Sequence, residues 1–245
     1  MRYILTILMC LICSRVEGGA SRSFDGISDS VDFTKPSGLT VGTDSFTAMV
    51  WIYWTQGPDT ASEIVISQQD GTGTGRNWID IDDGNGDGLG GDRLISFLGA
   101  VAIDLGATAV VNIWMHVAVV SDEAAGTIQG FINGVAGTAG ASVIEAATGI
   151  LRLGVNKTGT VTDFEGQMRD FILCEKALSA QEITTCMRNP KAIVGIAGSN
   201  AYIYAPLFGE GGSEINLLNS ALNGTLTGTA SSTNGAPSFF PKGAN

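Results

Sequence analysis

The sequence predicts an all-β fold: a two-sheet antiparallel jelly-roll sandwich with one short helix near residues 179–188. Short apolar or alternating runs recur along the chain, and Gly, Asn, Asp and Thr separate them. Helical features occur in one segment alone. Of the 245 residues, 44% are hydrophobic and 15% are charged, so the chain can bury a sizeable core and intrinsic disorder is excluded.

The expected strands share a length of five to nine residues and a content of β-branched and aromatic side chains. In chain order they are Phe46–Trp54, Ser62–Ser67, Trp78–Asp82, Leu94–Leu98, Trp114–Ser121, Thr127–Ile132, Ile150–Gly154 and Met168–Cys174. Dipeptides that tolerate left-handed backbone, such as Asn133-Gly134 and Asp25-Gly26, predict tight turns. Many short strands joined by turns favour a sandwich.

The expected helix covers Ser179–Arg188. Ser179 is followed three residues later by Glu182, the spacing of a capping box in which each side chain bonds the backbone of the other residue. Asn189-Pro190 ends the helix, because proline cannot continue it.

The first 20 residues are expected to be a signal peptide or an N-terminal arm. Met1-Arg2 is followed by the apolar run Tyr3–Cys13 and by small residues up to Ala20, which is typical of a secretory leader. The run is shorter than the roughly 20 apolar residues that a membrane-spanning helix needs. The alternative is an uncleaved arm buried in a partner. Either interpretation leaves residues 21–245 as a single domain.

The charge balance excludes some partners and some chemistry. With 13 Lys+Arg against 24 Asp+Glu the net charge is −11, so the chain has no excess of basic residues with which to bind nucleic acid. One histidine, His116, leaves little for zinc binding, and its apolar surroundings favour a satisfied structural residue. Asp80-Ile81-Asp82 comes closest to the alternating acids of a hydrolase, but a solvent-facing strand edge explains it equally well. We therefore expect no enzyme activity.

Several motifs occur in the order and spacing of a known family. They are Ser23-Phe24-Asp25-Gly26, Val31-Asp32-Phe33, Trp114-Met115-His116-Val117-Ala118-Val119, Phe131-Ile132-Asn133-Gly134 and Ala177-Leu178-Ser179-Ala180-Gln181-Glu182-Ile183. Over about residues 21–185 the chain resembles laminin-G-like, concanavalin-A-like jelly-roll domains. The resemblance implies the sandwich fold and a binding function outside the cell or on a particle surface.

The C-terminal segment, residues 196–245, carries a second resemblance. Tyr204-Ala205-Pro206-Leu207 and Asn223-Gly224-Thr225-Leu226 are similar to a segment that in the family usually precedes the Phe-Asp-Gly strand. The segment either closes its own sandwich, as in a circular permutant, or is exchanged with a neighbouring copy to form a homo-oligomer. Self-closure is the expectation that we favour.

Calcium is the expected cofactor, at one of two places. Asp83, Asn85 and Asp87 lie at alternate positions before Gly88, as at the start of a calcium loop, although a hairpin turn needs the same residue types. The family resemblance implies a second possibility, a rim site with Asp70 and Asp163. We expect at least one rim calcium.

Two tryptophans are candidates for a sugar platform, since sugars stack on aromatic faces and bond to neighbouring polar groups. Trp54 and Trp78 lie at strand ends, where partial exposure would allow a sugar platform, but core or rim packing is the alternative that we favour for each. If one of them is a platform, Trp78 is preferred, because Asn77 and Arg76 lie beside it. Trp51 and Trp114 match core positions of the family and are expected to be buried. Cys174 and Cys186 could pair as a disulfide in an oxidising compartment or remain buried thiols.

Two functions fit these observations. The first is a non-catalytic glycan-binding or adhesion module, secreted or displayed on a surface, that binds a glycan or a cell-surface protein. The alternative is a structural or decoration protein of a virion or an extracellular assembly, in which the sandwich is a packing unit. Low charge and the displaced C-terminal segment support the alternative.

Overall fold

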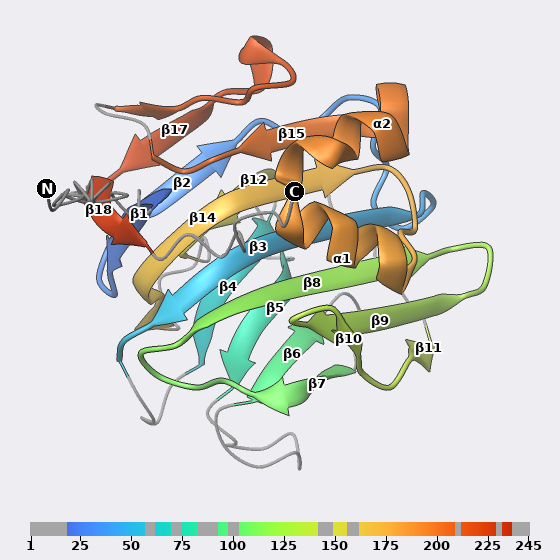
Figure 1. The fold of residues 1–245 in the computed structure, drawn as a ribbon, viewed down its shortest axis with the longest axis horizontal. Helices are drawn as coiled ribbons and strands as arrows, with labels where there is room; N and C mark the ends of the chain where they lie inside the picture. The colour runs from blue at the N-terminus through green and yellow to red at the C-terminus, as the bar shows by residue number, and fades with distance from the viewer. Residues whose placement is uncertain are drawn as a thin grey trace, which may run out of the picture.

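Two sheets face each other across one apolar core in the computed structural model of the chain (Figure 1). The structure describes residues 19–56, 62–69, 75–82, 93–97, 103–141, 149–155, 162–208, 212–228 and 232–236. Nearly all strand pairs are antiparallel, so the predicted jelly-roll sandwich is confirmed. None of the helices within these ranges has the length and apolarity that a membrane crossing requires.

Sheet A runs in the order β10-β9-β8-β3-β14-β1-β18, with β11 also on β9 and β15 also on β14. Its strands are β1 (Gly19–Asp25), β3 (Phe46–Trp54), β8 (Trp114–Asp122), β9 (Thr127–Ile132), β10 (Val135–Ala136), β11 (Gly140–Ala141), β14 (Glu165–Cys174), β15 (Ala201–Ala205) and β18 (Ser232–Ala236). The turn between β9 and β10 is the predicted Asn133-Gly134, with φ of 52° and 81°. Both residues adopt the left-handed backbone that such a two-residue hairpin requires.

Sheet B runs in the order β16-β17-β2-β12-β4-β5-β6-β7, and β13 pairs in parallel with β4. Its strands are β2 (Ser30–Phe33), β4 (Glu63–Gln69), β5 (Gly75–Asp82), β6 (Arg93–Phe97), β7 (Ile103–Thr108), β12 (Ile150–Leu153), β13 (Thr162–Asp163), β16 (Ser213–Glu214) and β17 (Gly224–Thr227). Every strand expected from the sequence coincides with a strand of sheet A or sheet B.

The core between the sheets follows from strand alternation. In β3, Ala48, Val50, Ile52 and Trp54 face sheet B, because successive side chains of a strand point to opposite faces. Side chains from both sheets interdigitate there, and each fully buried aliphatic or aromatic side chain contributes about 1.5–3 kcal/mol. The outer face of sheet A, which points away from sheet B, has a second apolar cluster that includes Met49.

Short helices cover part of that outer face (Figure 1). α1 (Ala180–Arg188) begins with the predicted capping box, in which Ser179 and Glu182 bond reciprocally. Its residues Ile183 and Cys186 are buried against sheet A. Beyond α1 the chain forms a short helical segment that the sequence analysis did not anticipate: η1 (Pro190–Ala192), α2 (Ile193–Ala197) and η2 (Gly198–Asn200), with η3 (Ser220–Leu222) later in the chain.

The C-terminal segment pairs with sheets of its own chain. β15 adds to β14, β17 adds to β2 and β18 adds to β1. A buried ion pair joins the same region, since Arg22 Nε donates to Glu214 Oε1 at 2.6 Å. These contacts describe self-closure, and exchange between copies stays a prediction. Because β1 begins at Gly19, cleavage after Ala20 would remove its first two residues.

Candidate functional site

The partner of β14 changes from one strand to another in the middle of sheet A. The first half of β14 pairs with β1, up to Met168 opposite Arg22, and the second half pairs with β15, from Phe171 opposite Ala205. Arg169 and Asp170 lie in the seam between these two pairings, where the register also shifts. Asp170 has φ of 53°, a backbone that side-chain-bearing residues adopt rarely, and such strain often occurs at functional sites.

Arg169 lies between two aromatic rings on the outer face of sheet A. Its guanidinium carbon is 5.4 Å from the ring centroid of Trp51 and 5.3 Å from that of Trp114, which is the distance range of cation–π contacts. Burial lowers the pKa of Arg169, although Asp170 and Tyr204 act in the opposite direction. The structure thus holds a desolvated cation in a fixed position beside the seam.

His116 lies beside Trp51 and Arg169 on the outer face of sheet A, and the three side chains form a row. It lies opposite Trp51 in the neighbouring strand β8, and the two rings meet edge to face at 5.3 Å between centroids. Burial, and secondarily Arg169, lowers the pKa of His116 to about 3, so the ring is neutral at physiological pH. The expectation of a satisfied structural histidine is wrong in one respect, because Nδ1 is buried without a hydrogen-bond partner.

Asp170 and Tyr204 are joined across the seam. The Tyr204 hydroxyl donates to Asp170 Oδ1 at 3.2 Å, and the Asp170 backbone N–H donates to the Pro206 carbonyl at 3.2 Å. Burial raises the pKa of Asp170 and also that of Tyr204. Both bonds fix the strained residue with its carboxyl group beside the tyrosine hydroxyl.

A cavity of about 400 Å³ opens at this point, and we call it the seam pocket. Its described lining is formed by Ala20, Arg169, Asp170, Asn189, Pro190, Lys191, Tyr204, Pro206 and Phe208. Phe208 is 49% exposed, so an aromatic face is accessible to a ligand there. The pocket therefore combines cations, a carboxyl group, an amide, a hydroxyl group and an aromatic ring.

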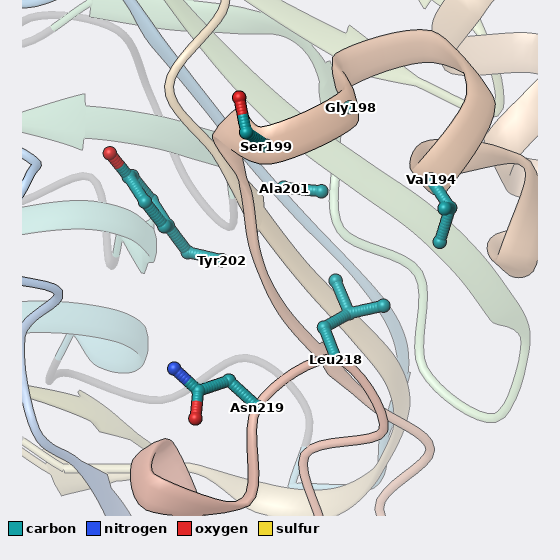
Figure 2. Close-up of a pocket in the computed structure, with 7 residues that line it drawn as sticks. All are labelled: Val194, Gly198, Ser199, Ala201, Tyr202, Leu218 and Asn219. Atoms are coloured by element: carbon teal, nitrogen blue, oxygen red, sulfur yellow. The ribbon is translucent and has the colours of Figure 1, made fainter.

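A second cavity, of about 430 Å³, lies at the other end of β15 (Figure 2). Figure 2 shows it between the helical segment with Val194, Gly198 and Ser199 and the loop with Leu218 and Asn219, with Ala201 and Tyr202 on β15. The hydroxyl of Tyr202 donates to the carboxylate of Glu175. Burial and this carboxylate raise the pKa of Tyr202 to about 12. We call this cavity the β15-end pocket.

The candidate sugar platforms Trp54 and Trp78 are not accessible, so the favoured alternative of core packing holds for both and the platform hypothesis is wrong. Trp54 is 2% exposed and Trp78 is 1% exposed. The Trp54 indole N–H donates to both carboxylate oxygens of buried Glu63 at 2.8 Å, and Trp78 packs on Phe46 at 4.7 Å between ring centroids. Strand alternation directs both indoles into the core.

Trp51 and Trp114 are buried as predicted, with 6% and 7% exposure. They lie on the outer face of sheet A, however, and form a small cluster with Tyr53 and Met187 that is separate from the main core. The functional candidates that the sequence analysis missed, including Asp170, had one visible signal: the charged pair Arg169-Asp170 interrupts the otherwise apolar run 168–174.

The remaining predicted ligand residues are only partly described. The backbone of Arg76 and Asn77 lies in β5, opposite Gln68 and Ser67, while their side chains lie outside the described part of the structure. Of the predicted calcium ligands, Asp70, Asp83, Asn85 and Asp87 lie outside the described residues. The structure therefore brings none of these side chains into the seam pocket's described lining.

Asp163 is the one predicted calcium ligand among the described residues. It is 7% exposed, and its Oδ1 is buried without a hydrogen-bond partner. Burial and the nearby carboxylates of Asp25 and Asp29 raise the pKa of Asp163 to about 6. Within the described ranges, no three His, Cys, Asp or Glu side chains are placed to hold a metal ion. Calcium binding therefore stays a prediction.

The acids of β5 are buried. Asp80 is 1% exposed and Asp82 is 6% exposed, so the expected solvent-facing strand edge is wrong. The hydroxyl of Ser62 donates to Asp82 Oδ1 at 3.3 Å.

The two cysteines are also buried. Cys174 and Cys186 are free thiols in the apolar cluster below α1, so the second of the two alternatives, buried thiols, holds. Burial raises the pKa of Cys174 to about 12 and that of Cys186 to about 11, so both thiols are protonated and unreactive.

Comparison with known proteins gives one family and several similar structures. A family model described as "Concanavalin A-like lectin/glucanases superfamily" (Laminin_G_3) matches residues 25–184, more than half of the chain. No curated protein sequence matches the chain.

Two solved structures share the fold. A candidate carbohydrate binding protein from Bacteroides ovatus ATCC 8483 is similar with a TM-score of 0.69 and 18% identity, over 89% of this chain and 60% of that one. Domain 4 of AbnA, a GH43 extracellular arabinanase from Geobacillus stearothermophilus, was solved in complex with arabinotriose. It is similar with a TM-score of 0.50 and 20% identity, over 67% of this chain and 75% of that one. At these identities the likeness shows the fold.

Proposed function

Since the chain belongs to the concanavalin A-like lectin/glucanase superfamily, we propose that it is a non-catalytic carbohydrate-binding module whose glycan site is the seam pocket. The names of the similar structures support carbohydrate binding, as one is a candidate carbohydrate binding protein and the other holds arabinotriose. Because the fold hosts many functions, the proposal depends on the site rather than on this likeness.

The composition of the seam pocket is the observation that carries the proposal. Sugar rings present an apolar face and a rim of hydroxyl groups, so a glycan site combines an accessible aromatic ring with hydrogen-bonding groups in fixed positions. Phe208 offers the ring, while Asp170, Asn189 and Lys191 offer acceptors and donors around it. The bond from Tyr204 to Asp170 orients the carboxyl group before a ligand arrives, which lowers the cost of ordering on binding.

The non-catalytic role is part of the proposal. Glycoside hydrolysis usually needs two carboxyl groups on opposite sides of the scissile bond. Asp170 is the one carboxyl residue in the described lining of the seam pocket, and Tyr204 already bonds to it. His116 does not line the described pocket. This arrangement supports binding without turnover.

A glycan array on the full chain, with and without calcium, tests the proposal. We expect binding that Phe208→Ala reduces about tenfold, which corresponds to about 1.4 kcal/mol. Calcium dependence is proposed from the sequence, so EDTA is expected to weaken binding and to lower the melting temperature. Ile27→Ala is the matched control, because Ile27 is also a large exposed apolar residue and lies outside the seam pocket.

Two outcomes would contradict the proposal. A folded protein that binds no glycan on the array would remove the carbohydrate-binding function. Equal binding by the Phe208→Ala and Ile27→Ala variants would keep the function and remove the seam pocket as its site.

We also propose that the protein acts outside the cell, which the leader-like sequence of residues 1–20 supports. Mass spectrometry of the N-terminus of the protein from its natural source tests this. A chain that begins close to Ser21 would support secretion. A chain that still begins at Met1 would favour the assembly arm instead.

A further inference from the structure

The last described strand, β18, ends beside the seam pocket. It runs antiparallel to β1, with Ala20 opposite Asn234 and Gly19 opposite Ala236. Ala20 also belongs to the lining of the pocket. The chain therefore leaves β18 at the border of the pocket, and residues 237–245, which lie outside the described part of the structure, follow from that point.

Residues 237–245, which we call the aromatic tail, read PSFFPKGAN and contain an aromatic pair. Phe239 and Phe240 are adjacent, and Pro237 and Pro241 flank them. Adjacent aromatic rings bury a large apolar area when they meet a matching surface. Proline fixes one backbone dihedral, so a segment with two prolines has less conformational entropy to lose when it docks.

The seam pocket offers apolar surface to such a pair. Its described lining includes Ala20, Pro190 and Pro206 beside the polar groups, and the ring of Phe208 is 49% exposed. An aromatic side chain that packs on Phe208 removes apolar area of both rings from water. The pocket therefore suits a phenylalanine ring from the chain itself.

The distances bring Phe239 and Phe240 to this surface. Sheet A has the order β14-β1-β18, so β14 lies two strand spacings from β18, which is about 10 Å. An extended chain advances about 3.3 Å per residue and covers this distance in about three residues. Phe239 is the third residue after Ala236. A tail that crosses β1 on the outer face of sheet A thus places the two rings over the part of β14 that contains Arg169 and Asp170.

We propose that the aromatic tail folds back across the outer face of sheet A and seats Phe239 and Phe240 in the seam pocket, with a ring against Phe208. The consequence for ligand binding rests on the proposed function, because a glycan and the tail then compete for the same pocket. If the tail occupies the pocket for about nine-tenths of the time, the apparent dissociation constant for a glycan is about ten times the intrinsic one. The tail thus acts as an internal competitor that a glycan must displace.

Photo-cross-linking of the full chain tests the docking without any glycan. The probe is p-benzoylphenylalanine in place of Phe240, a side chain that keeps the aromatic ring and forms a covalent bond with neighbouring C–H groups on irradiation. We expect mass spectrometry to find the cross-link within residues 189–191 or 204–208 of the same molecule, and Phe208→Ala to abolish most of it. The same probe in place of Ile27, an exposed residue outside the described lining, is the control and should give no cross-link to these residues.

Glycan binding tests the competition. The double variant Phe239→Ser with Phe240→Ser frees the pocket, so the glycan with the strongest signal on the array should bind to it about tenfold more tightly than to the wild type, as measured by titration calorimetry. Ile27→Ser makes the same type of change outside the described lining and should leave the affinity unchanged. Melting curves check that each variant is folded.

The outcomes separate this inference from the proposed function. A cross-link that maps elsewhere in the chain, or an unchanged glycan affinity of the double variant, overturns the docked tail and leaves glycan binding at the seam pocket in place. A cross-link that joins two molecules into a dimer overturns docking within one chain. A cross-link to the pocket lining in a protein that binds no glycan on the array overturns the proposed function and retains the docked tail.

Discussion

The two faces of sheet A use the same strands for different purposes. The inner face is apolar from β3 to β14, with Phe171 and Met168 fully buried in the core. The outer face is divided: helices cover one apolar part, and the other part is the row of Trp51, Arg169 and His116 beside the seam. Alternation in a strand thus lets one face stabilise the fold while the other carries polar groups.

The largest expected effect is on the inner face. Phe171→Ala removes a fully buried ring that packs on Phe33 at 5.4 Å between centroids, so we expect a loss of about 3–5 kcal/mol in the free energy of unfolding. Phe208→Ala, at an exposed position of the seam pocket, should change stability by less than about 0.5 kcal/mol. Urea unfolding of both variants measures the difference. Equal losses would contradict the division between the two faces.

A second inner-face effect concerns the buried ion pair that joins β1 to the C-terminal segment. Glu214→Gln removes the carboxylate that accepts from the buried Arg22 guanidinium, so we expect a loss of about 3 kcal/mol in the free energy of unfolding. The double variant Arg22→Met with Glu214→Met should recover most of this loss, because it removes both charges together.

Size-exclusion chromatography of the same variants tests self-closure. If the C-terminal segment is exchanged between copies instead, the wild type is an oligomer, and Glu214→Gln should shift it toward smaller species. A monomer in both cases is the outcome expected from the pairing of β15, β17 and β18 within the chain.

Much of the fold could be predicted from sequence because its signals are local. Strand runs such as Phe46–Trp54, the Asn133-Gly134 turn and the capping box at Ser179 each need only a few neighbouring residues. The face of the sheet on which an indole lies cannot be decided from its neighbouring residues alone. Trp51 and Trp54 are three residues apart in one strand and therefore lie on opposite faces, so only the assignment of the core face decides which one is inside.

The candidate site could not be predicted because it depends on pairings between distant parts of the chain. The seam exists because β1 and β15, about 180 residues apart in sequence, pair with successive halves of β14. The family resemblance implied a strand at Phe24-Asp25 and a C-terminal segment that closes the sandwich, but not that both would pair with β14. The charged pair Arg169-Asp170 could have been noticed, but without β15 it does not reveal a pocket.

A smaller effect on stability is expected from the carboxyl group of Asp163. Because burial, Asp25 and Asp29 raise the pKa of Asp163 from 3.8 to about 6, the folded state holds its proton more tightly than the unfolded state. This contribution to stability is therefore fully present below about pH 4 and is lost as the pH rises to about 6. We expect the melting temperature of the wild type, relative to that of Asp163→Asn, to fall by a few degrees over this range.

The comparison with Asp163→Asn isolates this carboxyl group from the other acids, which titrate in both proteins. Added calcium sharpens the test. A bound cation near Asp163 would stabilise the ionised form and reverse the slope, whereas an identical slope with calcium and with EDTA would remove Asp163 as a calcium ligand. A difference that does not vary with pH would contradict the raised pKa.

The smallest effect on stability is expected at the seam itself. Asp170→Gly relieves a left-handed backbone that costs a non-glycine residue about 1 kcal/mol, but it also removes the acceptor of the Tyr204 hydroxyl, worth about 0.5–1.5 kcal/mol. These two terms oppose each other, but the variant also removes the carboxylate whose Oδ2 lies 3.8 Å from the Nε of buried Arg169. Because this ion pair is long and Asp170 is partly exposed, stability should fall by only about 1 kcal/mol while glycan binding falls strongly. Asn112→Gly, at φ of 61° on an exposed turn, reports strain relief alone. If Asp170→Gly destabilised the protein as much as Phe171→Ala, the role of Asp170 would be to stabilise the fold. A loss of glycan binding in a protein of unchanged stability would mean that the strained backbone of Asp170 positions its carboxyl group for the ligand.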